Sequence, residues 1–132
     1  MTYFIDANIM SYMLRGSEAI QRKMLSLLLQ GHKISIPVVA YYEVKRGLLA
    51  KSALKKLKLF NHFAESLGIT DMTRNSFDIA SEIYSYLKKL GQLLEDDDIF
   101  IGSIVLENEG ILATNNIRHL GRIPNLQCEI WE

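Results

Sequence analysis

The stretch Tyr3-Phe4-Ile5-Asp6 near the start of the chain is an apolar run that ends at a carboxylate. Such a run is typical of a short buried β-strand with a polar residue at its carboxyl end. Similar apolar runs occupy residues 34–36 and 111–114, and segments with helical spacing lie between the three. Strands that alternate with helices favour a parallel sheet covered by helices on both faces. The sequence therefore predicts an α/β fold.

The other elements are recognised by apolar spacing and by the residues that end each segment. Helices are expected at residues 8–14, from the cap Ser17 to Gly31, at 52–67, from a cap at Thr73 or Asn75 to Gly91, and at 99–106, with a helical turn near Arg118. Pro37 is expected to start a turn or a helix that extends to Leu49. A strand fragment at residues 69–70 and a last strand near residues 127–131 complete the pattern. The acidic run at residues 95–98 is expected to be a loop that opens the helix after it.

The bulk composition fits one compact domain spanning residues 1–132, because 132 residues with 48% apolar content suffice for a single core. The formal net charge is zero, so any nucleic-acid binding must come from local charge or from a bound metal. The single cysteine, Cys128, excludes a disulfide within the chain and a cysteine-rich zinc site, and a place in the last strand is expected for it. Neither a signal peptide nor a membrane-spanning segment is expected, which favours the cytoplasm.

Oxygen-bearing side chains follow several of the expected strands. Asp6 ends the first strand, Glu43 lies just beyond the second, and Asn115 and Asn116 end a later one. The acidic residues 96–98 stand at the start of the helix that precedes that later strand. Ligands of parallel sheets bind at the carboxyl ends of the strands, and crowded carboxylates with water are the ligands that Mg²⁺ or Mn²⁺ takes. The pattern predicts one divalent-metal site.

Each of these residues also has a purely structural interpretation. Asp6 could cap the following helix, and Glu43 could be a solvated helix residue. The acidic run could stabilise the positive end of a helix, and the two asparagines could form a turn. Only their common position at strand ends and helix starts favours a functional site. Within the run, Asp98 is the expected inward ligand because Gly102 stands one turn later, Asp96 is the next candidate, and Asp97 is expected in solvent.

The chain resembles the PIN-domain ribonucleases, specifically the VapC-type toxins of toxin–antitoxin pairs. The matching pieces run through the chain in order and are Phe4-Ile5-Asp6-Ala7-Asn8-Ile9, Tyr41-Tyr42-Glu43-Val44-Lys45-Arg46-Gly47-Leu48, Asp96-Asp97-Asp98-Ile99-Phe100-Ile101-Gly102, Thr114-Asn115-Asn116 and Ile130-Trp131. The resemblance implies a PIN-like three-layer fold, in which helices flank a central, mostly parallel sheet.

The same resemblance implies a Mg²⁺- or Mn²⁺-dependent endoribonuclease that cuts a cellular RNA, often a transfer RNA. It also implies a cognate antitoxin that covers the acidic site, and a homodimer. Carried over by position, Asp6 and Asp98 are metal ligands and Glu43 is the third acid. Asn116 stands where many relatives have a fourth acid, and Asp96 is expected to supply that charge. Relatives commonly carry hydroxyl residues at the positions of Ala7 and Ala40.

Substrate and partner contacts are expected around this site. Thr114, Asn115 and Asn116 could bind water, metal or phosphate, and Lys45, Arg46 and Arg118 could contact RNA or be ordinary surface charges. The lysine-rich helix at residues 51–58 could face RNA. Its leucine face and that of residues 20–28 could equally form a groove for an antitoxin helix. Trp131 is expected to anchor the core.

Two other functions fit part of the pattern. A phosphatase of the haloacid-dehalogenase type also uses an Asp after its first strand, but such enzymes carry a second Asp two residues later, where this chain has Asn8. A non-catalytic module could use the same acids to hold a metal or a basic partner for structure alone. Cutting of RNA that depends on Asp6 would separate the nuclease from both.

Overall fold

A computed structural model describes residues 1–131 and contains one five-stranded sheet. The strands are β1 (Thr2–Ile5), β2 (Lys33–Pro37), β3 (Ile69–Thr70), β4 (Ile111–Thr114) and β5 (Cys128–Ile130). Their order across the sheet is β3-β2-β1-β4-β5, and every neighbouring pair is parallel. The α/β class and the parallel sheet expected from the sequence are confirmed.

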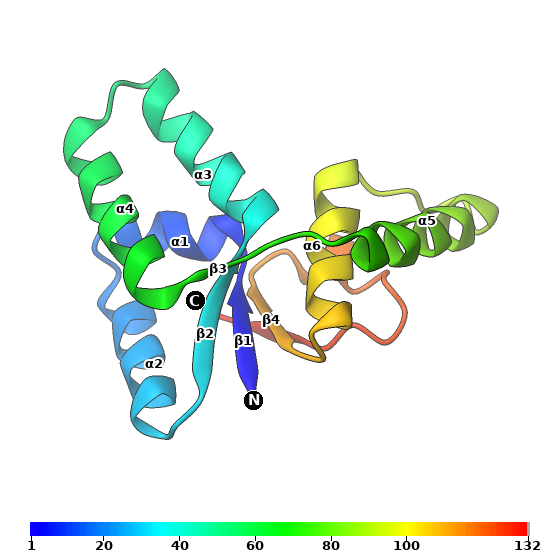
Figure 1. Ribbon diagram of the computed structural model, residues 1–132, viewed down its shortest axis with the longest axis horizontal. Helices are drawn as coiled ribbons and strands as arrows, with labels where there is room; N and C mark the ends of the chain where they lie inside the picture. Colours follow the sequence, from blue (N-terminus) through cyan, green and yellow to red (C-terminus); the bar gives the residue numbers. More distant parts are fainter. Residues whose placement is uncertain (132) are drawn as a thin grey trace.

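Seven helices surround the strands in the described part of the chain. They are α1 (Ala7–Leu14), α2 (Glu18–Leu29), α3 (Val38–Ala50), α4 (Leu54–Leu67), α5 (Arg74–Lys89), α6 (Asp96–Glu107) and α7 (Ile117–Leu120). Figure 1 shows α2 and α4 on one side of the strands and α5 and α6 on the other, which gives the three layers. None of the helices described within residues 1–131 is both long and apolar enough to cross a membrane.

β1 is the central strand of the sheet, and its second half is buried on both faces. Phe4 and Ile5 are each 1% exposed. Phe4 pairs with Ser35 of β2 on one side and with Leu112 of β4 on the other. A central parallel strand buried on both faces is expected to consist of large apolar residues, and the buried half of β1, Phe4 and Ile5, does. Since all strands are parallel, the ends of β1, β2 and β4 meet at the same edge of the sheet.

Two helix starts differ from the expectation. α6 begins at Asp96 rather than at Ile99, so the acidic residues form its first turn instead of a loop. Carboxylates are favourable at the positive end of a helix, which explains the earlier start. α4 begins at Leu54 rather than at Ser52, whose φ of 52° lies in the left-handed region. α5 is capped by Thr73, one of the two expected caps.

The buried face of α5 is narrower than the apolar spacing predicts. Ala80, Ile83 and Leu87 are buried, but Tyr84, which shares their helical spacing, is 42% exposed. α5 packs chiefly on α6, so only one narrow stripe of its surface is covered. At the end of the chain, Trp131 is 2% exposed and anchors the core as expected. Cys128 lies in the last strand and is half-buried.

Replacing Gly110 with Ala is expected to destabilise the protein. A Cβ there would collide with the Phe4 ring and lie 2.8 Å from the Thr2 carbonyl oxygen, and the backbone of β1 cannot move away without disturbing the sheet. Such overpacking costs about 1–3 kcal/mol, measurable by urea denaturation. Gly47→Ala is the matched control, because a Cβ at this helical position meets nothing within 4 Å. It should stabilise the protein by about 0.5–1 kcal/mol. Equal effects of both substitutions would refute the packing argument.

Candidate active site

Asp6 follows β1 and precedes α1, and its carboxylate is fixed from three directions. The Ala7 backbone N–H donates to Oδ1 at 2.8 Å, and the Thr114 hydroxyl donates to Oδ2 at 2.7 Å. The Asn8 side-chain amide also donates to Oδ2, at 3.2 Å. Asp6 is only 5% exposed. The residue therefore does cap a helix, and it is also a buried carboxylate at the sheet edge, so the two interpretations are compatible.

The pKa of the Asp6 carboxyl is raised above its ordinary value. Burial is the largest cause, and the charge of Asp97 adds to it. The hydrogen bonds from Thr114, Ala7 and Asn8 act in the opposite direction, because donors stabilise the ionised form. The environment therefore disfavours the negative charge even though three donors hold it in place. A cation at the edge would relieve that cost.

Glu43 lies in the second turn of α3 and is half-buried. Its pKa is raised to about 8, first by burial, next by a hydrogen bond with Asp97, and further by the charges of Asp97, Asp6 and Asp98. α3 contacts both α1 and α6, which brings Glu43 to the acids of the other two elements. The structure thus brings Glu43 together with Asp6 and Asp98, three residues from distant parts of the sequence.

Asp98 and Asp97 reach the site from the first turn of α6. Asp98 is half-buried, and its pKa is raised to about 6 by burial and by the charges of Asp97 and Asp6, while nearby His119 lowers it. The Asp97 carboxylate accepts a hydrogen bond from the Asp98 backbone N–H at 3.1 Å. Asp97, expected in solvent, is half-buried and lies beside Glu43, whereas Asp96 is exposed. Asp97, rather than Asp96, is therefore the half-buried residue beside Glu43.

Thr114 links the end of β4 to the same carboxylate. Its side chain is fully buried, and its hydroxyl accepts a hydrogen bond from the Asn116 backbone N–H at 3.0 Å while donating to Asp6. Thr114 therefore orients Asp6 and the turn after β4, and it has no free surface for a substrate contact of its own. Because Ala7 offers only its backbone, the hydroxyl that reaches Asp6 comes from Thr114.

Asn115 and Asn116 follow Thr114 at the rim of the site. The Asn115 backbone N–H donates to the Asn8 side chain at 3.3 Å, and the Asn115 amide contacts the Tyr12 hydroxyl. The Asn116 side chain bonds to His119 Nδ1 at 3.3 Å. Asn115 is exposed and Asn116 is half-buried, so both amides border the edge where the acids meet.

The expected RNA-contacting cations lie outside this cluster. Arg46 and Arg118 are exposed. The Arg46 guanidinium is 5.0 Å from the ring centroid of Tyr42, and its pKa is raised first by Tyr42 and also by the charges of Glu43 and Asp97. The Lys45 ammonium donates to the Tyr41 hydroxyl at 2.9 Å. Arg46 thus stands near the acids, while Lys45 is engaged with its own helix.

The donor set fits a hard divalent cation. The side chains that meet here offer carboxylate, amide and hydroxyl oxygens, and a bound cation would reverse the elevation of the carboxyl pKa values. Within residues 1–131, however, no three His, Cys, Asp or Glu side chains are already gathered closely enough to form a metal-ligand group. A bound cation would offset the repulsion between these carboxylates.

Residues 3–126 match the sequence model of the PIN domain. The chain belongs to the PIN-domain family. Over the full length of this PIN domain, the ribonuclease VapC2 of Rickettsia felis is 27% identical, with 100% of this chain and 99% of the relative covered.

Solved structures agree with the family assignment. The PIN domain superposes on a chain of the R. felis VapBC2 complex bound to a promoter DNA fragment with a TM-score of 0.92, 26% identity and full coverage of both chains. VapBC-1 of nontypeable Haemophilus influenzae gives a TM-score of 0.88 at 22% identity, covering 99% of this chain and 98% of that one, which shows the fold. The family and the three-layer fold expected from the resemblance are confirmed.

Three residues at the site were not predicted from the sequence. Asn8 was noted only as the absence of an acid, yet its amide donates to Asp6. His119 was not considered, although it lies three residues after Asn116 on α7, a spacing that brings side chains together on a helix. Tyr12 was also missed, and no sequence signal links it to Asn115, which is 103 residues away.

Thr114→Val is expected to destabilise the fold because it removes the hydroxyl. The substitution keeps the shape of the side chain, so the hydroxyl is the only group lost. The Asp6 carboxylate would lose a donor and the Asn116 N–H an acceptor, both beside a buried position. The expected loss is about 1–3 kcal/mol in the free energy of unfolding, measured by urea denaturation. Thr2→Val is the control, because the described residues give its hydroxyl no hydrogen bond, and its effect should stay within about 0.5 kcal/mol. Loss of stability in the control alone would contradict the role of Thr114.

In EDTA, the folded protein is expected to lose stability as the pH rises from about 4.5 to about 8. An unfolded chain releases the Glu43 proton near 4.5, whereas the folded chain retains it up to about pH 8, so ionisation favours unfolding across that interval. Asp98 adds to the loss between 3.8 and about 6. Melting temperatures across this pH range test the expectation. Glu43→Gln should flatten the upper part of the curve, and the exposed control Glu65→Gln should leave it unchanged. A parent-like decline in Glu43→Gln would refute the assignment.

Proposed function

We propose that this protein is a divalent-metal-dependent endoribonuclease toxin, acting on cellular RNA in the cytoplasm and inhibited by a cognate antitoxin. Its membership of the PIN-domain family supports a nuclease. The ribonuclease VapC2 of R. felis and the VapBC2 complex, both similar over the full length of this chain, support the toxin assignment. Whether a transfer RNA is the target stays a prediction, as does the homodimer.

The observation that carries this proposal is the meeting of Asp6, Glu43 and Asp98 at one edge of the sheet. These acids come from the end of β1, from α3 and from α6. The charges of Asp6 and Asp98 raise the pKa of Glu43, and the charge of Asp6 also raises the pKa of Asp98. A fold that needed only stability would separate such charges, because each ionised carboxylate disfavours its neighbours. Perturbed carboxyl groups gathered at the carboxyl ends of parallel strands are typical of a functional site.

The proposed roles follow from how firmly each side chain is held. Asp6 and Asp98 are the metal ligands, and Asp6 is oriented by the buried hydroxyl of Thr114. Glu43 completes the ligand set or holds a water molecule for attack. Asn115 and Asn116, at the rim, donate to phosphate oxygens, and Arg46 contacts the RNA backbone from outside. Thr114 is a positioning residue rather than a substrate contact.

When bound, Mg²⁺ or Mn²⁺ supplies Lewis acidity toward a phosphate oxygen and toward water. We propose that Asp97 contributes the additional carboxylate that the sequence analysis assigned to Asp96. Asp97 lies beside Glu43, and its charge acts on Asp6, Glu43 and Asp98 alike. Asp96 is exposed instead, and it borders both the hollow between α5 and α6 and the cavity that Asp98 lines.

The antitoxin is proposed to place an apolar helix between α2 and α4. A groove of about 470 Å³ lies between these helices, and its apolar lining includes Met24, Leu25, Leu28, Leu59, Phe63 and Leu67. Leu25 is 57% exposed and Leu28 is 43% exposed, although the same helix buries three other apolar side chains in the core. Exposed apolar side chains along a groove between two helices are how proteins receive an amphipathic helix.

Neither rival function is favoured by the geometry. Asn8, which occupies the place of the second Asp of a haloacid-dehalogenase phosphatase, holds Asp6 through its amide. It cannot exchange a proton as that enzyme class requires. A module without a metal would not need to keep Glu43 in contact with Asp97 at a cost to the ionised form of Glu43. Turnover of RNA decides between the nuclease and the module.

Asp6→Asn and Asp98→Asn should each abolish RNA cutting, because each removes a charged ligand while keeping the shape of the side chain. Cutting of total RNA by the purified protein with Mn²⁺ should fall by about a hundredfold or more, since even supporting residues of metal sites typically cost tenfold to a hundredfold. The exposed Asp71→Asn serves as the control and should cut as the parent does. Hydrolysis of small phosphate esters without RNA cutting would instead indicate a phosphatase, and Mn²⁺ binding without any turnover would indicate the module.

The neighbouring pair Asp97→Asn and Asp96→Asn tests the exchanged assignment within the same assay. Loss of cutting and of stabilisation by Mn²⁺ in the Asp97 variant alone would support the proposed ligand set. The reverse result would restore Asp96 to the site.

A further inference from the structure

A second cavity adjoins Glu43 on the side away from α6. Its volume is about 450 Å³, and it lies between α1, α3 and α4. Three cations line it: Arg15 just after α1, Lys51 just after α3, and Lys56 in α4. We call this cavity the basic groove. Figure 1 shows that α3 and α4 run side by side away from the strands and join at their far ends, above α1. The groove therefore leads from that junction to the acidic site.

The cations of the basic groove are available for a ligand. All three are exposed. The ion pairs found in residues 1–131, Arg22 with Glu18 and Lys23 with Glu129, involve none of them. Arg15 lies 5.4 Å from the ring centroid of Tyr12, a contact that leaves the edge of the guanidinium free to donate. Glu43 is the one acid among the lining residues, so the three cations still leave the hollow with a net positive charge in a chain whose formal net charge is zero.

The floor of the basic groove is open along α3. Gly47 lies one helical turn after Glu43 and lines the groove, and a Cβ built on it meets nothing within 4 Å. A long polymer could thus pass along this face of α3 and reach Glu43 without displacing a side chain of the helix. The geometry suits a continuous chain better than a small compact ligand, because the groove is open at the surface.

The opposite side of the acidic site has a different character. There a cavity of about 410 Å³ is bordered by Glu95, Asp96 and Asp98, with His119 and Arg122. The Arg122 guanidinium already donates to the Leu93 carbonyl oxygen at 3.3 Å. Three carboxylates therefore face one arginine and one imidazole, and a polyanion is repelled on this side. The two flanks of the site differ in the sign of their charge.

We propose that the basic groove binds the phosphate backbone of the RNA on one side of the cleaved bond, with Arg15, Lys51 and Lys56 as the phosphate contacts. This inference rests on the proposed function and adds to it the path of the substrate. Phosphate contacts supply most of the affinity for single-stranded nucleic acid, and they come from Lys and Arg along a groove. The RNA is held asymmetrically, by the Glu43 flank and not by the Asp98 flank.

The two grooves on α4 are distinguished by their side chains. Lys56 faces the basic groove, whereas Leu59 and Phe63 face the apolar groove shared with α2. A phosphate backbone is therefore assigned to the first groove, and the apolar helix of an antitoxin to the second. An acidic protein segment in the basic groove is the competing occupant.

The test is the binding of a fluorescein-labelled oligouridylate by the variant Arg15→Gln/Lys51→Gln/Lys56→Gln. Asp6→Asn is present in all proteins, with EDTA, so that the RNA is not cut. Each phosphate contact on a single strand contributes about 0.7 to the slope of log affinity against log salt. The triple variant should therefore lose about two from that slope and bind about a hundredfold more weakly at 0.1 M salt.

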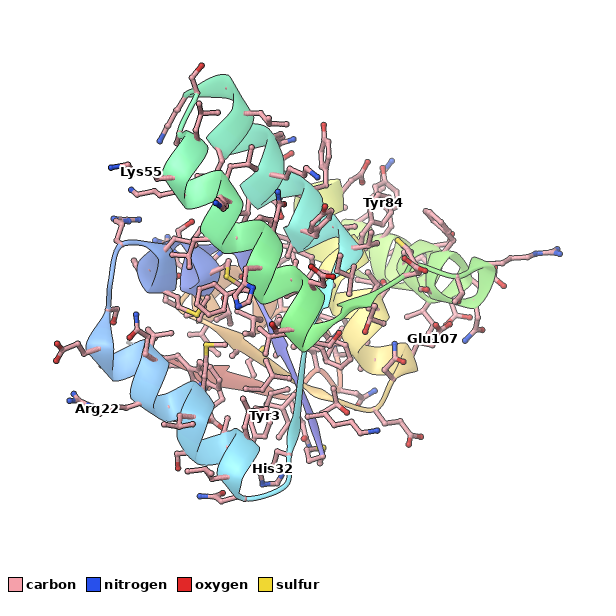
Figure 2. All side chains as sticks on the ribbon, turned by 60° about the vertical axis from the view of Figure 1, so that its left-hand side comes forward. Tyr3, Arg22, His32, Lys55, Tyr84 and Glu107 are labelled. Carbon is pink, nitrogen blue, oxygen red and sulfur yellow. The ribbon has the colours of Figure 1, made fainter. Side chains whose placement is uncertain are left out.

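The matched control is Lys55→Gln/Lys58→Gln/Arg74→Gln, which removes the same charge from exposed positions that line neither groove. Figure 2 shows Lys55 pointing outward from α4. The control should keep nearly the full slope and affinity. Because both triple variants carry the same net charge, a difference between them isolates the groove from the overall charge of the protein.

Each outcome decides the proposal. Weakening confined to the groove variant supports it. An equal loss of RNA affinity in both triple variants would overturn the proposal, because the overall charge of the protein would then account for binding. Unchanged RNA binding by the groove variant would also overturn it and leave the groove to an acidic protein segment. RNA cutting by the parent protein with Mn²⁺ is measured separately. If the parent cuts RNA and the groove variant binds RNA with unchanged affinity, only the assignment of the groove fails. If the parent cuts no RNA, the proposed function itself fails.

Discussion

The buried carboxylate of Asp6 is the point on which the functional edge of this molecule depends. It joins the end of β1, the start of α1 and the end of β4, through the Ala7 N–H and the Thr114 hydroxyl. Because β1 and β4 are adjacent parallel strands, that one group fixes both the edge of the sheet and the direction in which the chain leaves it. The acids from α3 and α6 then meet a charge that cannot move aside. Repulsion at this edge is therefore a consequence of the fold.

Charge in this chain is balanced overall and separated locally. The formal net charge is zero, yet acids gather at the sheet edge and cations line the neighbouring groove. A cation-binding centre next to a polyanion-binding surface needs such a separation, because a uniformly basic protein would compete with the metal for the acids. A formal net charge of zero is thus consistent with an RNA-cutting site, because local charge is sufficient.

The fold could be predicted from the sequence where apolar spacing and strand ends were sufficient, as with Phe4 and Ile5 in β1. The meeting of Asp6 and Glu43 followed from the parallel topology, since the carboxyl ends of parallel strands share one edge. The choice among three consecutive aspartates did not follow. Successive helix residues point about 100° apart, so the inward position depends on where α6 begins, and the acidic residues moved that start to Asp96. Contacts such as Tyr12 with Asn115 depend on packing between distant segments, which no local pattern encodes.

The two faces of α4 place a restriction on how the sequence can diverge. One face carries Lys56 toward the basic groove, and another carries Leu59 and Phe63 toward the apolar groove. Inserting or deleting one residue early in the helix would rotate everything after it by about 100°, turning the leucine face toward solvent. Substitutions can alter either groove separately, but changes in the length of α4 would disrupt both at once. We expect homologous chains to vary in length at the turns on either side of this helix and to keep its register.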